Sequence, residues 1–311
     1  MAGTDPVKGR IRCSICPAPS IIRFRDTDRQ LCAEHFSADL KERIKKTISD
    51  HTMINPGDRI AVALSGGKDS TALLLLLTDI VPAYDGVTLV AVTIDEGISG
   101  YRSDTIRSAE KIAQETGVEH IITSFSGLFG KDLDEILKGR EERACSICGI
   151  LRRKALASAA QSAGAIKLAT GHNLNDEAQS VLMNTMRGDL VRFIRDSGSD
   201  SGGCFIPRIK PLMDISEKEI AVYLMSMDRF PDLPECPYTR YALRAEVRSR
   251  LSTLEFRHPG TMRNLVTGKE RLASILAGIP LGGAINRCTE CGEPCSGTVC
   301  QTCRLIDTVL K

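Results

Sequence analysis

Short apolar stretches alternate with amphipathic segments through the middle of the chain, and this alternation limits the fold more than any other feature. It begins after the turn Asn55-Pro56-Gly57-Asp58. A repeated order of strand and helix implies a parallel sheet with helices on both faces, which is a doubly wound α/β architecture. The predicted pairs are Arg59–Leu64 with Ser70–Val81, Val87–Ile94 with Arg102–Thr116, Glu119–Ser124 with Ile150–Ala163, and Ile166–Ala169 with Asn175–Met186.

Helical patterns continue on both sides of this alternation. They are predicted at 33–51, Ser216–Met227, Tyr238–Leu254 and Thr261–Ala277, while Ser197–Gly203 is predicted to be a flexible loop. A length of 311 residues suggests about two domains. The predicted organisation is an N-terminal cysteine-containing module with a helix at 1–54, the α/β domain at 55–235, a basic helical region at 236–284 and a C-terminal cysteine-containing ribbon at 285–311.

No membrane-spanning or secretory segment is visible in the sequence. The longest apolar run, Ala72–Leu77, is far shorter than the roughly 20 residues that cross a bilayer, and the first ten residues contain no apolar signal region. We therefore expect a cytoplasmic protein without a membrane partner, in a compartment that keeps thiols reduced. The 12 cysteines then favour metal or redox chemistry over disulfides.

Cysteines gather at both ends of the chain with the spacing of metal ligands. Each end holds two pairs whose members are three residues apart, which is typical of tetrahedral structural Zn²⁺. Because four ligands leave no open position, the expected role is structural stability. A lone histidine more often lies on the surface, but His35 completes a set of three cysteines. The two sets are Cys13, Cys16, Cys32 and His35, and Cys288, Cys291, Cys300 and Cys303, while Cys204 and Cys295 receive no role.

The segment Ser65–Ser70, with the sequence SGGKDS, directly follows the first predicted strand. A strand, a glycine turn and a helix N-terminus form an anion site, because backbone amides and the helix dipole both favour phosphate. Lys68 adds positive charge, and Asp69 is a candidate ligand of Mg²⁺. The segment lacks the spacing of a Walker A motif. The simpler alternative is a glycine turn that only begins a helix.

This loop and two further segments resemble the N-type ATP pyrophosphatases. The segments are Val92–Gly97 (VTIDEG) and Thr170–Glu177 (TGHNLNDE), and all three lie at the carboxyl ends of strands, where open α/β sheets bind ligands. The resemblance implies cleavage of ATP between its α and β phosphates, with Asp69 and Asp176 in catalytic roles. Taken alone, Asp176 also fits an ordinary charge at a helix N-terminus. The implied ATP-binding residues are Ala63, Ser65, Gly66, Gly67, Lys68, Asp69, Ser70, Ile94, Asp95, Gly171 and Asp176.

Three cysteines in the middle of the chain form a different pattern. Cys145 and Cys148 make a CxxC pair, and Cys236 follows much later. A CxxC pair alone is ambiguous between zinc, a redox dithiol and an iron–sulfur cluster, and buried free cysteines are a further alternative. Within an ATP pyrophosphatase, the pattern resembles the tRNA 2-thiolation enzymes of the TtuA type and the archaeal and eukaryotic wobble-uridine thiolases. That resemblance implies a 4Fe-4S cluster with one open iron for exogenous sulfur.

The resemblance extends from Cys13 to Cys303 and implies an ATP-dependent tRNA uridine 2-sulfurtransferase. It further implies adenylation of the uridine C2 oxygen, replacement by cluster-delivered sulfur, a ubiquitin-like protein thiocarboxylate or sulfide as donor, and a homodimer. Family members often carry a catalytic lysine after CxxCG, where this chain has Arg152, which keeps the charge but cannot act as a base. Arg152, as the catalytic candidate, or Lys154 would then stabilise phosphate charge. The alternatives are cytidine thiolation, amide or lysine ligation, and a noncatalytic zinc protein that binds RNA.

The net charge of +2 is small, but basic residues concentrate in one segment. Between Cys236 and Arg271 there are eight Lys or Arg against three Asp or Glu. Arg240, Arg244 and Arg248 recur every four residues, which places them on one helical face. Such a face is often merely solvated. Beside a cluster cysteine it is a candidate contact for the tRNA backbone, since phosphate contacts position RNA without reading its sequence.

Overall fold

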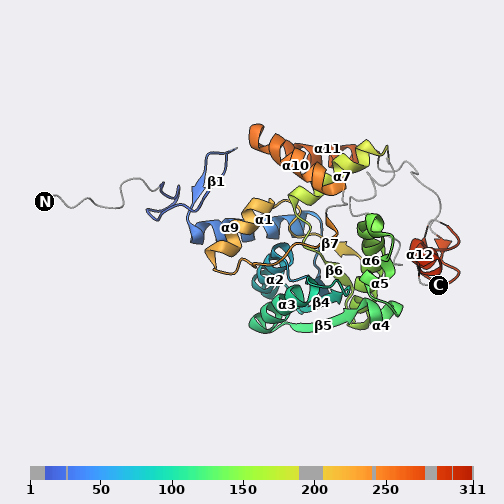
Figure 1. Ribbon diagram of the computed structural model, residues 1–311. Helices are drawn as coiled ribbons and strands as arrows, with labels where there is room; N and C mark the ends of the chain where they lie inside the picture. Colours follow the sequence, from blue (N-terminus) through green and yellow to red (C-terminus); the bar gives the residue numbers. More distant parts are fainter. Residues whose placement is uncertain are drawn as a thin grey trace.

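The computed structural model describes residues 11–25, 27–188, 206–239, 243–276, 286–295 and 297–309, and its centre is a five-stranded sheet (Figure 1). The strands lie in the order β5-β4-β3-β6-β7, and every neighbouring pair is parallel, which confirms the doubly wound α/β prediction. The two-residue β7 is not among the predicted strands, because two residues show no alternation. The strands are β3 (Arg59–Ala63), β4 (Thr88–Asp95), β5 (Glu119–Ser124), β6 (Lys167–Ala169) and β7 (Arg208–Ile209).

Helices cover both faces of the sheet, and β3 shows why. Its Ile60 and Val62 side chains belong to one core, whereas Ala61 belongs to the other, because successive side chains of a strand point to opposite faces. The first face is covered by α1 (Ala33–Asp50), α2 (Lys68–Ile80), α3 (Arg102–Thr116) and α9 (Glu217–Ser226), and the second by α4 (Phe125–Phe129), α5 (Leu133–Leu137) and α6 (Ala144–Ser162).

A third group of helices lies beside this sandwich, with α7 (Leu174–Met186), α10 (Leu243–Arg257) and α11 (Thr261–Ile275) packed together (Figure 1). Their shared core is formed by Leu174, Ala178, Val247, Leu251, Met262 and Val266. The predicted basic helical region therefore exists and shares a core with a helix of the α/β domain.

Small antiparallel hairpins form the two terminal modules, which lie at opposite ends of the molecule in Figure 1. The first pairs β1 (Ile22–Arg23) with β2 (Gln30–Leu31), and the second pairs β8 (Asn286–Arg287) with β9 (Pro294–Cys295) and is followed by α12 (Gln301–Val309). Both modules pack into the main cores. Ile22 and Leu31 join the core of α1, and Leu305 on α12 joins the core of α6.

Helix α6 begins at Ala144 rather than at Ile150, the predicted start. Ala144, Ile147, Cys148 and Leu151 are all buried at helical spacing, so the first turn already belongs to the apolar face of the helix. The 3-10 turn η2 (Glu141–Arg143) precedes it. The CxxC pair thus lies on the first turn of a helix, which fixes the direction of both thiols.

Helix α10 spans Leu243–Arg257 in the described residues, and the predicted start, Tyr238, is not helical. Tyr238 lies in a turn, and its hydroxyl donates a hydrogen bond to Asp134 Oδ1 at 2.8 Å beside α5, whereas α10 packs on α7. Tyr238 and α10 thus pack against different parts of the molecule.

Outside the described residues lie the predicted loop Ser197–Gly203, Cys204 and the RNA-face candidate Arg240.

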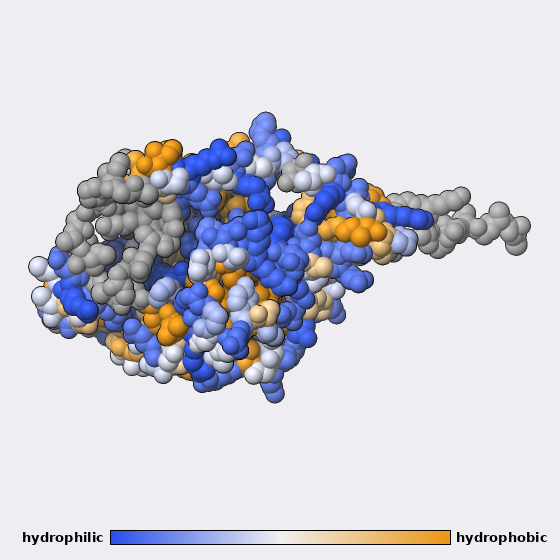
Figure 2. Space-filling model, turned by 180° about the vertical axis from the view of Figure 1, so that it is seen from behind, coloured by the Kyte–Doolittle hydropathy of each residue, from blue (hydrophilic) through white to orange (hydrophobic). Residues whose placement is uncertain are grey.

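The face shown in Figure 2 is mainly hydrophilic, with hydrophobic residues in separate small groups. None of the helices in the described ranges combines the length and the apolar character needed to cross a bilayer. The cysteines that the structure describes are all free thiols. This agrees with the prediction of metal or redox chemistry in place of disulfides.

Candidate functional site

A cavity of about 320 Å³ opens at the carboxyl ends of the central strands. Its walls are the loop after β3, the end of β4 and the loop after β6, so the three strand-end segments meet there as predicted. Asp95 does not line it and instead accepts a hydrogen bond from the Gly97 amide at 2.9 Å. The predicted ATP-binding residues that line the cavity are Ala63, Ser65, Asp69, Ser70, Ile94, Gly171 and Asp176, and Gly66, Gly67 and Lys68 belong to the same loop as Ser65.

The SGGKDS loop is held in shape by one of its own hydroxyl groups and by a glycine. The Ser70 hydroxyl donates to the Gly67 carbonyl at 2.9 Å. Gly66 has a φ of +85°, and a Cβ there would lie 1.9 Å from the Thr105 carbonyl oxygen, so only glycine fits. Because α2 begins directly after Gly67, the loop turns a helix N-terminus toward the cavity, as an anion site requires.

Acidic side chains surround the lysine of the loop. Lys68 Nζ lies 2.9 Å from Asp69 Oδ2 and 2.8 Å from Glu217 Oε1. Asn173 Nδ2 donates to Asp69 Oδ1 at 3.1 Å, and Asn173 also caps α7 in a reciprocal pair with Asp176. The loop after β6 thereby places Asp176 close to Asp69. Carboxylate oxygens beside a phosphate-binding loop are the ligands that Mg²⁺ takes in proteins.

Burial raises the pKa of Asp69, although the neighbouring Lys68 ammonium lowers it. The nearby carboxylates of Asp176 and Glu217 raise this pKa further, because like charges repel. A divalent cation between the carboxylates would offset both the burial and the repulsion. The electrostatics of the cavity therefore suit a bound cation together with the phosphates of a nucleotide.

The three middle cysteines come together from α6 and from a distant loop. Cys145 Sγ lies 3.7 Å from the Tyr238 carbonyl oxygen, which joins the Cys236 loop to α6. Burial raises the pKa of Cys148 to about 11 and also raises that of Cys236, and the three thiols interact electrostatically. Among the described residues they do not converge on one point as the ligands of a single ion would. A helix turn and a distant loop thus bring three thiols into one region of the molecule, and cysteine thiolates are the ligands that hold iron–sulfur clusters.

Arg152 lies between the cavity and these cysteines. It lines the cavity, its Nη2 donates to Cys148 Sγ at 3.2 Å, and its Nε lies 2.6 Å from Glu96 Oε1. Lys154 instead forms an ion pair with Glu293 of the C-terminal module. Of the two basic residues suggested for phosphate charge, the structure therefore brings Arg152 to the cavity and places Lys154 elsewhere.

Several residues of this site escaped the sequence analysis, and four of them form contacts with its charged groups. Glu96 and Asn173 lie inside the quoted VTIDEG and TGHNLNDE segments, so a signal for them was present. Arg102 and Glu217 are the first residues of α3 and α9, and the fold alone brings them to the loop. No spacing in the sequence could have revealed the latter two.

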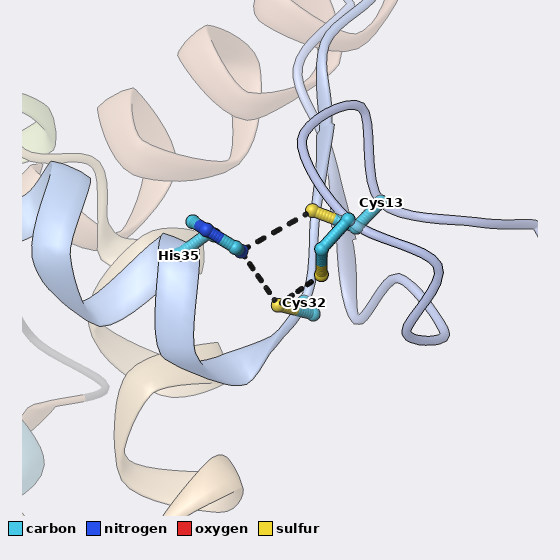
Figure 3. A group of neighbouring side chains, drawn as sticks. Cys13, Cys32 and His35 are labelled. Atoms are coloured by element: carbon cyan, nitrogen blue, oxygen red, sulfur yellow. Dashed lines mark hydrogen bonds between the residues drawn. The ribbon is translucent and has the colours of Figure 1, made fainter.

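The N-terminal set converges on one point, as Figure 3 shows for Cys13, Cys32 and His35. His35 Nδ1 lies 3.2 Å from Cys32 Sγ and 3.7 Å from Cys13 Sγ, and the sulfur atoms of Cys16 and Cys32 are 3.8 Å apart. In a tetrahedral site with Zn–S bonds of about 2.3 Å, the sulfurs lie about 3.8 Å apart. The set therefore has the size of a tetrahedral Zn²⁺ site.

The C-terminal set has the same form. The ligand atoms of its four cysteines lie within 4.8 Å of one another, and those of Cys291 and Cys300 are 3.8 Å apart. Backbone amides hold the sulfurs in place, with the Cys300 amide 3.2 Å from Cys288 Sγ. Cys295 lies outside the set, and its thiol contacts the Gly297 carbonyl. Both terminal sets could therefore hold a metal ion with four protein ligands.

The basic face of α10 turns toward the cavity. Arg244 Nη1 lies 3.4 Å from Asp176 Oδ1 and lines the cavity, and Arg248 pairs with Glu217. Both side chains remain about half exposed, at 46% and 53%. In the described structure the two arginines are thus engaged by acids of the cavity while still accessible to a ligand.

Comparisons with known proteins agree with this geometry. A family described as PP-loop domain matches residues 35–251. The tRNA 2-thiolation protein NcsA of Haloferax volcanii is 35% identical over an alignment of 319 positions, which covers 96% of this chain and 99% of that protein. The cytoplasmic tRNA 2-thiolation protein 1 of Mus musculus is 36% identical over 294 residues, which cover 92% of this chain and 69% of that protein.

A solved structure is also similar over nearly the whole chain. It is the U34-tRNA thiolase NcsA from Methanococcus maripaludis with its 4Fe-4S cluster, and it aligns with a TM-score of 0.83 at 33% identity and covers 96% of each chain. Such coverage extends well beyond the PP-loop domain, so the similarity includes sequence at both ends. The chain belongs to the PP-loop family and, within it, to the tRNA 2-thiolation proteins.

Proposed function

We propose that this chain is an ATP-dependent tRNA uridine 2-sulfurtransferase. One observation carries the proposal: Arg152 lines the nucleotide cavity and also donates a hydrogen bond to the Cys148 sulfur. Thiolation requires activation by ATP and delivery of sulfur at one carbon atom, so the two sites have to adjoin. The relatives named as tRNA 2-thiolation proteins support the same activity.

In the first step, ATP binds on the Ser65–Ser70 loop, with Asp69 and Asp176 as the ligands of Mg²⁺. The target uridine is flipped out of its stack, because its C2 oxygen is inaccessible there. That oxygen attacks the α phosphorus, the bond to the β phosphate breaks, and pyrophosphate leaves. Lys68 and Arg152 offset the negative charge that develops on the phosphates. Adenylation converts a poor oxygen leaving group into a good one.

In the second step, sulfur replaces the activated oxygen and AMP leaves. Cys145, Cys148 and Cys236 would hold a 4Fe-4S cluster, which with only three thiolate ligands would bind sulfide from the donor and present it to the activated carbon. The sulfur donor is a ubiquitin-like protein thiocarboxylate or inorganic sulfide. Arg152 remains charged throughout and contributes no proton transfer.

The remaining parts of the molecule hold and present the substrate. The terminal sets bind one Zn²⁺ each, and the exposed arginines of α10 contact the tRNA backbone, Arg244 and Arg248 by exchanging a carboxylate for a phosphate. Arg240 is part of this proposed face, although it lies outside the described residues. We further propose a homodimer that works in the cytoplasm.

Anaerobic purification tests the proposal. The wild type should be brown, release pyrophosphate only with tRNA, and yield 2-thiouridine in digested tRNA by mass spectrometry. Asp69→Ala should abolish all thiolation, whereas Cys295→Ser, outside every ligand set, should leave it intact. A colourless, zinc-loaded protein without tRNA-dependent pyrophosphate release would contradict the proposal and favour a noncatalytic RNA-binding protein. Thiolated cytidine in place of uridine would assign the alternative substrate.

A further inference from the structure

A buried carboxylate lies between the nucleotide cavity and the middle cysteines. Glu96 directly follows β4, and its side chain is only 3% exposed. Its two oxygens face two guanidinium groups: Oε2 lies 2.6 Å from Arg102 Nε, and Oε1 lies 2.6 Å from Arg152 Nε. A buried carboxylate needs such partners, because an unpaired buried charge is strongly unfavourable. Glu96 therefore fixes two arginines at once.

One of these arginines reaches toward the ATP loop. Arg102 is buried at the start of α3, and its Nη1 donates to the Ser65 carbonyl at 3.2 Å, while its Nη2 donates to the Ile94 carbonyl. Ser65 and Ile94 both line the nucleotide cavity. Neither Arg102 Nε nor Glu96 Oε2 forms a hydrogen bond within the described residues, so their contact acts as a charge pair. A displaced Arg102 would shift two walls of the cavity.

The other arginine reaches in the opposite direction. Arg152 Nη2 donates to Cys148 Sγ at 3.2 Å, while the side chain is 46% exposed. A long, half-exposed side chain has many rotamers, so the charge pair with Glu96 is what orients its planar fork. A hydrogen bond that a neighbouring side chain donates to a metal-bound sulfur orients that ligand and tunes the electronic properties of the metal group.

The net charge of Glu96, Arg102 and Arg152 favours a thiolate at Cys148. Two guanidinium groups face the single Glu96 carboxylate, so one positive charge lies in excess beside Cys148. A cysteine that binds iron does so as a thiolate, which would balance that charge. Without Glu96 the same arginines would repel each other across a buried space.

We propose that Glu96 is a positioning residue that sets both sites of the enzyme, by holding Arg102 against the nucleotide loop and Arg152 against the Cys148 sulfur. The proposal rests on the proposed function, since it assigns ATP to the cavity and a cluster to the cysteines. Glu96 lines the nucleotide cavity, but both of its carboxylate oxygens face arginines. Its effect passes through the two arginines to two separate binding groups.

The test compares Glu96→Gln with Asp58→Asn. Asp58 is also a buried acid in an ion pair, with Lys167 Nζ at 2.6 Å. It directly precedes β3 and so lies at the amino ends of the strands, opposite the cavity. In Glu96→Gln we expect the affinity of the cluster-free protein for ATP to fall about tenfold, and the cluster to be lost about tenfold faster to a chelator. The reduction potential of the cluster should also change, because the substitution alters both the N–H donor to sulfur and the charge beside it, whereas Asp58→Asn should leave the potential unchanged. Asp58→Asn should change only thermal unfolding.

Equal behaviour of the two variants in both binding measurements would overturn the proposal and make Glu96 an ordinary structural acid. If Glu96→Gln does not fold, Glu96→Asp keeps the charge with a shorter reach, and the same two measurements decide. Arg152→Lys should speed the loss of the cluster more than it lowers ATP affinity, because the positive charge and the Glu96–Arg102 pair both remain while the planar fork at Cys148 is lost. A wild type that holds no cluster would contradict the proposed function. In that case the ATP affinity of Glu96→Gln alone would support or overturn the role of Glu96.

Discussion

The terminal cysteine sets and the middle cysteines differ in how closely the fold brings their ligand atoms together. At each end, four ligand atoms lie within 4.8 Å of one another, and the surrounding module is joined to a main core through the first hairpin or through α12. The middle cysteines come from one helix turn and a distant loop, and charged residues of the cavity lie beside them. A closed set of four ligands stabilises a fold, whereas three ligands next to a cavity leave space for reaction. Under the proposed function, the same residue type would serve structure at the ends and chemistry in the middle.

The largest expected effect separates these roles. Cys148→Ala should remove the cluster absorbance and reduce thiolation below detection, because the cluster loses one of three ligands. The free energy of unfolding should change by only about 1 kcal/mol, as for an average substitution. Nucleoside mass spectrometry and thermal unfolding check the two parts. Thiolation that survives in Cys148→Ala while the protein stays brown would remove the middle cysteines from the reaction.

A terminal ligand should show the opposite result. Cys32→Ser should lower the free energy of unfolding by about 3 kcal/mol or more and Tm by roughly 10 °C, because structural zinc contributes folding energy. Cys32 also lies directly before α1, so the loss should loosen that helix. Elemental analysis should find one zinc fewer per chain. An unchanged Tm together with full zinc content would show that Cys32 is not a ligand.

The next effect concerns the cavity. Asp176→Asn should slow tRNA-dependent pyrophosphate release by about 10²-fold, as expected when one electrostatic contact to the transition state is lost. Asparagine can keep the reciprocal cap with Asn173, so the helix should remain. The control is Glu177→Gln, since Glu177 is a neighbouring acid that pairs with Lys210 and does not line the cavity. Equal rates in the two variants would deny Asp176 a special role.

A smaller effect is expected at the basic face. Arg248→Ala should weaken tRNA binding several-fold and lower the slope of log affinity against log salt by about 1, because one phosphate contact is lost. Arg250, two residues further along α10, points to a different side of the helix and provides the control. Salt titration of tRNA binding measures both. Equal slopes for wild type and Arg248→Ala would place the RNA elsewhere on the surface.

Local patterns in the sequence predicted most of the fold and the ligand sets. The SGGKDS loop, the TGHNLNDE segment and the terminal ligand pairs each lie within a few residues, so their spacing alone indicated their geometry. The contacts of Glu217 with Lys68 and of Glu96 with Arg102 depend on how distant elements pack, and no spacing encodes them. The early start of α6 is encoded in the helical spacing of Ala144, Ile147, Cys148 and Leu151. The charged segment before Ala144 obscures that apolar periodicity in the sequence.

The smallest expected effect is one of stability, and it concerns the cavity without ligands. Burial raises the pKa of Asp69 above 3.8, so the folded protein protonates this group before the unfolded chain does as the pH falls. The charged form is therefore unfavourable to the fold at neutral pH, and this loss of stability disappears at acidic pH. Asp69→Asn should be slightly more stable than wild type at pH 7 without Mg²⁺ or ATP, and the difference should shrink toward pH 3. Thermal unfolding over this pH range, with Asp58→Asn as a destabilised reference, measures it. An Asp69→Asn variant that is less stable than wild type at pH 7 would mean that the contacts of Asp69 with Lys68 and Asn173 outweigh the cost of its burial. The charged carboxylate would then not need a cation to offset that cost.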